Sequence, residues 1–134
     1  FYNVFIEIVL KFKISLYTKL KGVFMKKVVI RIKTKSKIID FTNVMYVAAF
    51  KKGILIVTSD GNEEVLRCSL QKIYEKIKPL GFIRCHKSFL VNVDYIDSFT
   101  KLECILQNGI SIPKGRYYSK ELTNELSNFG VVIK

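Results

Sequence analysis

The chain has 134 residues, within the range of a single domain and enough to bury one hydrophobic core. A hydrophobic content of 49% excludes a disordered tail. Its 23 Lys and Arg residues outnumber 11 Asp and Glu residues, so its net charge of +12 predicts a negatively charged partner such as nucleic acid or an anionic membrane. Three cysteines with no C-x-x-C pair favour a reducing, cytoplasmic location over a disulfide framework.

Residues 1–24 differ from the rest of the chain. The apolar run Phe1–Leu10 is shorter than the roughly 20 residues that span a bilayer, and no signal-peptide cleavage site follows it. A basic amphipathic segment on a membrane surface is one interpretation. The other is that translation starts at Met25, because codons for residues 21–23 can contain a ribosome-binding sequence. We expect the second: a leader or over-extended segment over 1–24, and a domain over 25–134 that keeps 19 basic and 10 acidic residues.

Strand patterns dominate the first half of the domain. Val28–Thr34 alternates apolar with polar residues, and Val44–Phe50 is continuously apolar, as in a strand buried on both faces. A tight basic turn, Lys51-Lys52-Gly53, separates Val44–Phe50 from a further strand over Ile54–Ser59. Asp60-Gly61 then predicts a hairpin turn into the next strand.

One helix follows, with Ser69 as its N-cap, apolar residues at helical spacing from Leu70 to Leu80, and Gly81 at its end. Asn108-Gly109 is a strong hairpin signal between two further strands, and a weaker helix runs from about 117–119 toward Gly130. The sequence therefore predicts a mostly β fold: small antiparallel sheets in a β-β-β sandwich, one short central helix and a C-terminal helical segment.

The stretch FIRCHKSFLVN, residues 82–92, holds the single histidine, so any acid–base chemistry must use His86. Its neighbour Cys85 would point to the opposite face of a strand, and no acid is placed to orient the ring for Ser88. The cysteines, 17 and 19 residues apart, lack the paired spacing of a zinc site, and no phosphate-binding glycine motif occurs. We expect no enzyme, cofactor, metal or small-molecule substrate.

Basic residues concentrate at predicted turns: Lys51 and Lys52, Arg84 and Lys87, Lys101, then Lys114 and Arg116. Turns on a rigid β scaffold can enter a DNA groove, where phosphate contacts position a protein and base contacts specify the sequence. A solvated basic face is the simpler alternative, and charge alone does not separate the two.

A specific resemblance to a known family favours DNA binding over a solvated basic face. FIRCHKSFLVNVDYI, residues 82–96, resembles the signature of the LytTR DNA-binding domain, the output module of many bacterial response regulators. The matching positions are Phe82, Arg84, His86-Lys87-Ser88, Phe89, Val91-Asn92 and Ile96. The flanking segments resemble the family as well, so the resemblance covers about residues 26–128.

The resemblance implies sequence-specific binding of double-stranded DNA by turns inserted in the major groove, in a bacterial transcriptional regulator. The three implied contact regions are Lys51-Lys52-Gly53, Lys87 and Arg116, and Lys114 is also expected to bind DNA. Arg116 could grip a guanine with two hydrogen bonds, while Lys87 supplies one flexible charge. Arg84 and Ser88 are expected at phosphates, and the structural residues are expected to be Phe82, His86, Phe89 and Asn92.

The chain departs from the family at Lys114-Gly115, where Ser-Arg is usual, so base readout there is expected to differ. No receiver domain precedes the module, which leaves open a stand-alone regulator or a piece of a longer protein. Cys85 beside two basic residues could be a redox-sensing thiolate, with a buried inert thiol as the alternative. We expect no membrane partner; a peripheral membrane protein and a protein-interaction module stay open as alternatives.

One small domain buries little DNA surface, so we expect two copies, as a homodimer on DNA, on promoter repeats about one helical turn apart or a small multiple of it. Changing the repeat spacing by half a turn should then lower affinity sharply in a binding titration. Affinity that does not respond to spacing would mean that independent monomers bind.

Overall fold

The computed structural model describes residues 26–128; the expected leader over 1–24 and the far end of the expected C-terminal helix lie outside this range. The elements in chain order are β1 (Lys27–Ile32), β2 (Lys35–Asp40), β3 (Val44–Phe50), β4 (Gly53–Thr58), β5 (Glu63–Leu66), α2 (Leu70–Ile77), the 3-10 helix η1 (Lys78–Leu80), β6 (Phe82–His86), β7 (Phe89–Asn92), the 3-10 helix η2 (Val93–Tyr95), β8 (Ile96–Phe99), β9 (Glu103–Leu106), β10 (Ser111–Pro113) and α3 (Arg116–Ser127).

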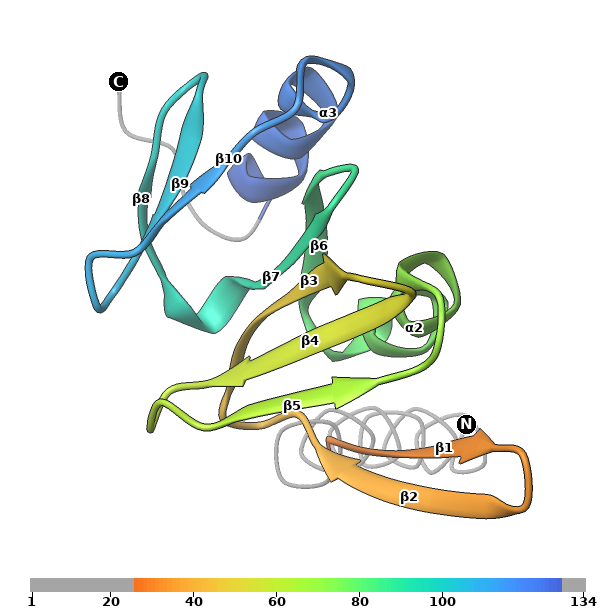
Figure 1. Cartoon of the computed structure of the whole chain (residues 1–134). Coiled ribbons are helices and arrows are strands. Elements are labelled where there is room, and N and C mark those ends of the chain that lie inside the picture. The colour runs from red at the N-terminus through yellow and green to blue at the C-terminus, as the bar shows by residue number, and fades with distance from the viewer. Residues whose placement is uncertain (1–25, 129–134) are drawn as a thin grey trace, which may run out of the picture.

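The strands form three antiparallel sheets: the hairpin β1-β2, a central sheet in the order β5-β4-β3-β7-β6, and a small sheet in the order β10-β9-β8 (Figure 1). The predicted mostly β fold with small antiparallel sheets and two helical segments is confirmed. The prediction omitted β2, because Lys35–Asp40 buries only one apolar residue, Ile39, and so carries almost no strand pattern.

Helix α2 begins as predicted, since the Ser69 hydroxyl accepts a hydrogen bond from the Lys72 amide at 3.0 Å. It ends earlier than predicted, at Ile77. Pro79 has no amide hydrogen to continue the α-helical ladder, and residues 78–80 form η1 instead. Gly81 then ends the segment with a φ of 97°, a conformation that glycine adopts without steric cost.

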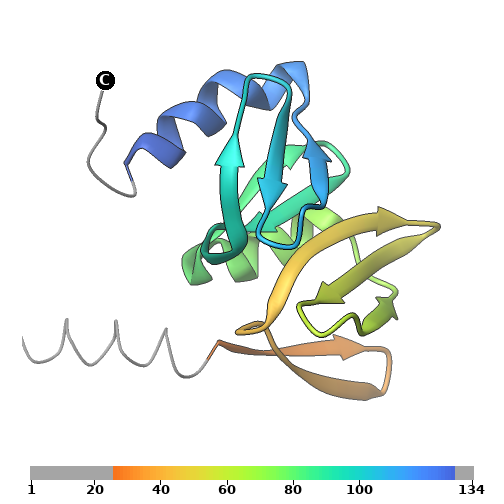
Figure 2. The same ribbon diagram turned by 90° about the vertical axis from the view of Figure 1, so that its left-hand side faces the viewer.

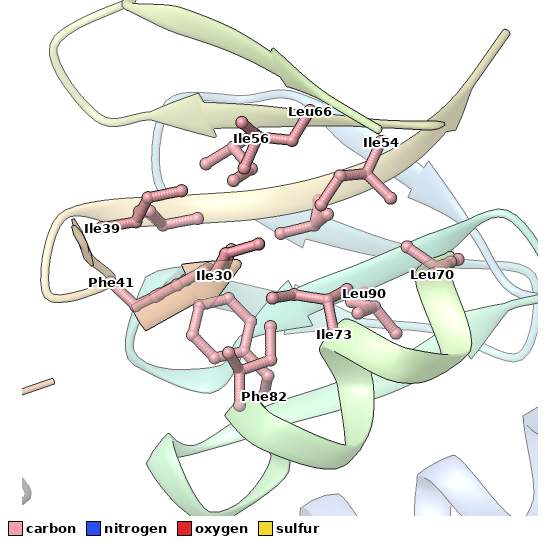
Figure 3. Packing of buried hydrophobic residues seen from close by; sticks show 13 residues of the cluster. Ile30, Ile39, Phe41, Ile54, Ile56, Leu66, Leu70, Ile73, Phe82 and Leu90 are labelled. Carbon is pink, nitrogen blue, oxygen red and sulfur yellow. The ribbon is translucent and has the colours of Figure 1, made fainter. Parts of the chain in front are cut away.

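Two hydrophobic cores lie on opposite faces of the central sheet. Leu90 of β7 points into the first core, which the β1-β2 hairpin and α2 cover (Figure 3). The next residue, Val91, points into the second core, which β9, β10 and α3 cover. Successive side chains on a strand alternate between faces, so β7 contributes to both cores and joins the two halves of the domain.

Asn92 connects β7 to β3 at the end of the pair. Its side chain is fully buried, with Nδ2 donating to the Val44 carbonyl at 2.9 Å and Oδ1 accepting from the Asp94 amide at 3.0 Å. Val44 lies next to a β-bulge, where the regular ladder is interrupted, so this side chain replaces part of a strand hydrogen-bond pattern.

Replacing Asn92 with Ala should lower the free energy of unfolding by about 1–3 kcal/mol, because the Val44 carbonyl would stay buried without this donor. Denaturant unfolding measures the change. The exposed Asn43 is a matched control, and Asn43→Ala should change stability by less than about 0.5 kcal/mol. Equal stability of the two variants would contradict the role given to Asn92.

Gly53, the first residue of β4, lies against the end of β5. A Cβ atom added at Gly53 would be 2.1 Å from the Leu66 carbonyl oxygen and 3.1 Å from the Arg67 Cα. Both neighbours are backbone atoms, which cannot move without shifting β5. Close packing against β5 therefore requires a glycine at position 53, whether or not this residue contacts DNA.

Gly53→Ala should cost about 1–3 kcal/mol of stability, the usual penalty for forcing extra volume into packed structure. Gly61→Asn is the control: no atom lies within 4 Å of a Cβ there, and Asn tolerates the positive φ of 88° better than most residues. If Gly53→Ala unfolds at the same denaturant concentration as the native chain, the close approach to β5 is not a constraint.

Candidate nucleic-acid interface

The first basic turn joins β3 to β4 in two residues, Lys51 and Lys52, since Phe50 pairs directly with Gly53. Both lysines are exposed, and Lys51 has a φ of 53°, which is uncommon outside glycine. The Lys51 ammonium lies 5.3 Å from the centroid of the Phe50 ring. The short turn fixes the backbone positions of both lysines at the end of the sheet.

The second turn, Lys87-Ser88, joins β6 to β7 and lies beside the end of β3. The Ala49 amide of β3 donates to the Ser88 carbonyl at 2.8 Å, one residue before β3 leads into the first turn. Lys87 is exposed and Ser88 is half-buried. The antiparallel pairing of β3 with β7 thus places the first and second turns at the same end of the central sheet.

The third turn leads from β10 into α3. The Gly115 amide donates to the Cys85 carbonyl of β6 at 2.9 Å, which attaches this turn to the strand that precedes Lys87. Arg116 is exposed at the first residue of α3. The three turns therefore lie along one side of the molecule, with Lys87-Ser88 in the middle (Figures 1 and 2).

Charge is distributed unevenly along β4. Its first residue follows Lys51-Lys52, whereas its other end leads to Asp60 and to Glu63 of β5. A hydrogen bond from the Thr58 hydroxyl lowers the pKa of the Asp60 carboxyl, which favours its charged form. The opposite ends of this strand thus carry opposite charge, and the basic end lies beside the other two turns.

Lys114 is buried, unlike the exposed Lys51, Lys52, Lys87 and Arg116. Its side chain is 8% exposed, and its ammonium lies 4.6 Å from the centroid of the Phe99 ring and 3.5 Å from the Thr123 hydroxyl. It packs between β8 and α3 within the domain. This position suits support of the third turn better than contact with DNA.

Arg84 also makes contacts within the protein. Its Nη2 donates to the Lys87 carbonyl at 2.7 Å, Nε to the His86 carbonyl at 3.4 Å, and Nη1 to Oε1 of Gln71 on α2. The guanidinium carbon is 5.5 Å from the centroid of the Tyr118 ring on α3. Arg84 was expected at a phosphate, but three of its donor atoms are directed at the domain itself.

The four residues expected to be structural have these surroundings. The Phe82 ring is buried and meets Phe41 edge-on at 5.8 Å, and Asn92 holds β3 as described above. His86 Nδ1 accepts a hydrogen bond from the Ser88 amide at 3.1 Å, and its ring centroid is 5.7 Å from that of Phe89. Gly115 lies against this ring and against Tyr118: a Cβ there would be 3.4 Å from His86 Cδ2 and 3.3 Å from Tyr118 Cδ2.

The interpretation of Cys85 as a reactive thiolate assumed that its basic neighbours lower the pKa of the thiol, and this premise is wrong. Cys85 is fully buried, and its sulfur donates to the Pro113 carbonyl at 3.6 Å. A hydrogen bond with Cys104, together with burial, raises the pKa of the Cys85 thiol. The alternative of a buried thiol therefore fits this environment.

Sequence reasoning did not single out Gln71 or Tyr118, the two residues that flank the Arg84 guanidinium. They come from α2 and α3, and with Arg84 they line a groove of about 190 Å³ between these elements. The sequence predicted only a weak helix that starts at about 117–119. Nothing in the sequence indicated the strand residue on which that helix would pack.

Within residues 26–128 no group of three or more His, Cys, Asp or Glu side chains is arranged to hold a metal ion. No helix in that range is long and apolar enough to cross a membrane.

Comparison with known proteins gives one consistent family. The sequence model of the LytTr DNA-binding domain matches residues 34–127. The transcriptional regulatory protein BtsR of Salmonella typhi is 30% identical over 90 residues, and the sensory transduction protein LytT of Bacillus subtilis is 31% identical over 90 residues. These matches cover 63% of this chain but only 36% and 37% of those proteins, so the chain spans just over a third of their length.

A solved structure agrees with the sequence comparisons. The LytTr DNA-binding domain of a putative methyl-accepting/DNA response regulator from Bacillus cereus superposes with a TM-score of 0.61 at 25% sequence identity. The match covers 75% of this chain and 96% of that domain. The family is defined by DNA binding and not by a catalytic activity. With the family signature carried on a matching fold, the chain belongs to the LytTr DNA-binding domain family.

Proposed function

We propose that this chain recognises a specific sequence in double-stranded DNA through its three basic turns, which enter the major groove. The observation that carries the proposal is the placement of Lys51-Lys52, Lys87 and Arg116 along one side of the molecule, by strand pairing and two backbone hydrogen bonds. Each of these side chains is exposed, and none has an acidic partner among the described residues.

The chemistry of the side chains suggests different tasks. The planar guanidinium of Arg116 can donate two parallel hydrogen bonds to O6 and N7 of a guanine, which a lysine cannot do. Lys87 can reach a base acceptor from the central turn. Lys51, Lys52 and the Ser88 hydroxyl suit phosphate oxygens, which position the protein without reading the sequence.

The first residues of α3 add to this surface. Gly115 gives the helix no side-chain cap, and its first turn contains no acidic residue. The N-terminal end of a helix carries partial positive charge, so α3 reinforces Arg116 beside a negatively charged partner. Gly53 supports the first turn by packing, and Lys114 supports the third turn by packing.

The names of the relatives extend the proposal to transcription. BtsR is a transcriptional regulatory protein and LytT a sensory transduction protein, each much longer than this match. We infer that this chain is the DNA-binding part of a cytoplasmic bacterial regulator. The DNA sequence that it selects would identify candidate target promoters.

Selection from random duplex DNA should first yield a preferred site. Arg116→Ala and Lys87→Ala should then each cost about 1–3 kcal/mol on that site and reduce the discrimination against altered base pairs. Lys51→Ala should instead weaken binding to preferred and scrambled duplexes alike and reduce the salt slope by about one. Titrations at several salt concentrations measure both quantities.

Lys76, exposed on α2, provides the control: Lys76→Ala should leave affinity and discrimination unchanged. The alternative functions predict other outcomes. No preferred site, with equal binding to vesicles containing phosphatidylserine, would support a membrane-surface protein. Identical behaviour of Arg116→Ala and Lys51→Ala would contradict the division into reading and positioning contacts.

A further inference from the structure

We infer that Arg84 is a positioning residue: it fixes the backbone on both sides of Lys87, and Gln71 and Tyr118 form the socket that holds it. The inference rests on the proposed function, because the value of a fixed Lys87 lies in what its side chain reads. It assigns Arg84 a role inside the protein, in place of a contact with a phosphate.

The argument begins with the two carbonyl groups that Arg84 contacts. The His86 carbonyl belongs to the peptide group before Lys87, and the Lys87 carbonyl belongs to the peptide group after it. Each peptide group is planar, so the direction of the Lys87 side chain depends on the two backbone dihedral angles between them. One guanidinium that binds both carbonyls restricts both angles at once.

The second of these peptide groups is held from both sides. Arg84 donates to its carbonyl at 2.7 Å, and its N–H, which belongs to Ser88, donates to His86 Nδ1 at 3.1 Å. His86 and Arg84 are two residues apart on β6, yet they act on opposite ends of the same peptide group. The turn is therefore braced by two side chains of the strand that precedes it.

The guanidinium is itself held between two helices. Gln71 of α2 accepts a hydrogen bond from Nη1, and the face of the Tyr118 ring of α3 lies 5.5 Å from the guanidinium carbon. The contact with Tyr118 is a cation–π contact. The simultaneous hydrogen bonds from Nε, Nη1 and Nη2 need the planar, forked shape of arginine, which the compact ammonium of lysine lacks. Since Arg116 starts the same helix as Tyr118, the socket also connects the second and third turns.

A phosphate contact and a positioning role predict different behaviour for the charge-conserving variant Arg84→Lys. At a phosphate, lysine supplies the same charge, so Arg84→Lys should retain affinity while Arg84→Ala lowers the salt slope by about one. In the positioning role, the single ammonium of lysine cannot replace the three guanidinium donors that reach both carbonyls and Gln71. Arg84→Lys should then lose about tenfold in discrimination at the base pair read by Lys87, as Lys87→Ala does, with an unchanged salt slope.

Substitution of the uncharged socket residues, Gln71 and Tyr118, provides a second test of the inference. Gln71→Ala and Tyr118→Leu remove no charge, so they should leave the salt slope unchanged, yet they should reproduce part of the loss in discrimination. Lys78→Ala is the matched control: Lys78 lines the same groove but its ammonium lies against Tyr74, 5.7 Å from the ring centroid. Loss of discrimination in Lys78→Ala, or full retention in both socket variants, would overturn the inference.

A measurement without DNA separates this inference from the proposed function. In the free protein, hydrogen exchange of the Ser88 amide should become at least about tenfold faster in Arg84→Lys. The Gly61 amide, which donates to Thr58 in the distant β4–β5 turn, serves as the internal reference and should not change. Unchanged exchange at Ser88 refutes the positioning role even if DNA binds. Faster exchange in a protein that selects no DNA site refutes the proposed function and keeps the brace.

Discussion

The antiparallel pairing of β3 with β7 is the contact on which the arrangement of the basic turns depends. Ala48 pairs with Phe89 in this register, so the strand that leads into Lys51-Lys52 ends beside the strand that leaves Lys87-Ser88. These segments are distant in sequence, and only the sheet brings them together. The hydrogen bond from the Gly115 amide to the Cys85 carbonyl of β6 then adds the third turn to the same side, so a shift in the β3–β7 register would separate the first turn from the other two.

Rigid turns matter for binding because ordering a flexible loop costs free energy when the complex forms. We infer that the short β3–β4 turn, the contacts of Arg84 and His86 around Lys87, and the buried Lys114 residue order this surface before a partner arrives. Four basic side chains remain exposed at its edge. In this proposal Arg84 and Lys114 support the shape of the turns. The exposed basic residues Lys51, Lys52, Lys87 and Arg116 contact DNA.

The sequence by itself determined the fold class and the family. Alternating and continuous apolar runs gave strands close to their observed bounds, Ser69 gave the start of α2, and Asn108-Gly109 gave the turn between β9 and β10. These signals are local: caps, turns and side-chain alternation depend on neighbours within a few residues. The signature over 82–96 and the net charge likewise needed no three-dimensional information.

Only the tertiary structure decided what each basic residue of the turns can do. Lys114 and Arg84 look like Lys87 and Arg116 in the sequence, yet one is buried against Phe99 and the other is directed at carbonyls of its own turn. Those partners come from β8, α2 and α3, whose positions are set by packing in the two cores. The same holds for β2, whose weak pattern becomes a strand because β1 pairs with it. A charged side chain carries no local record of its distant neighbours, so its exposure is known only once the sheets and helices are assembled.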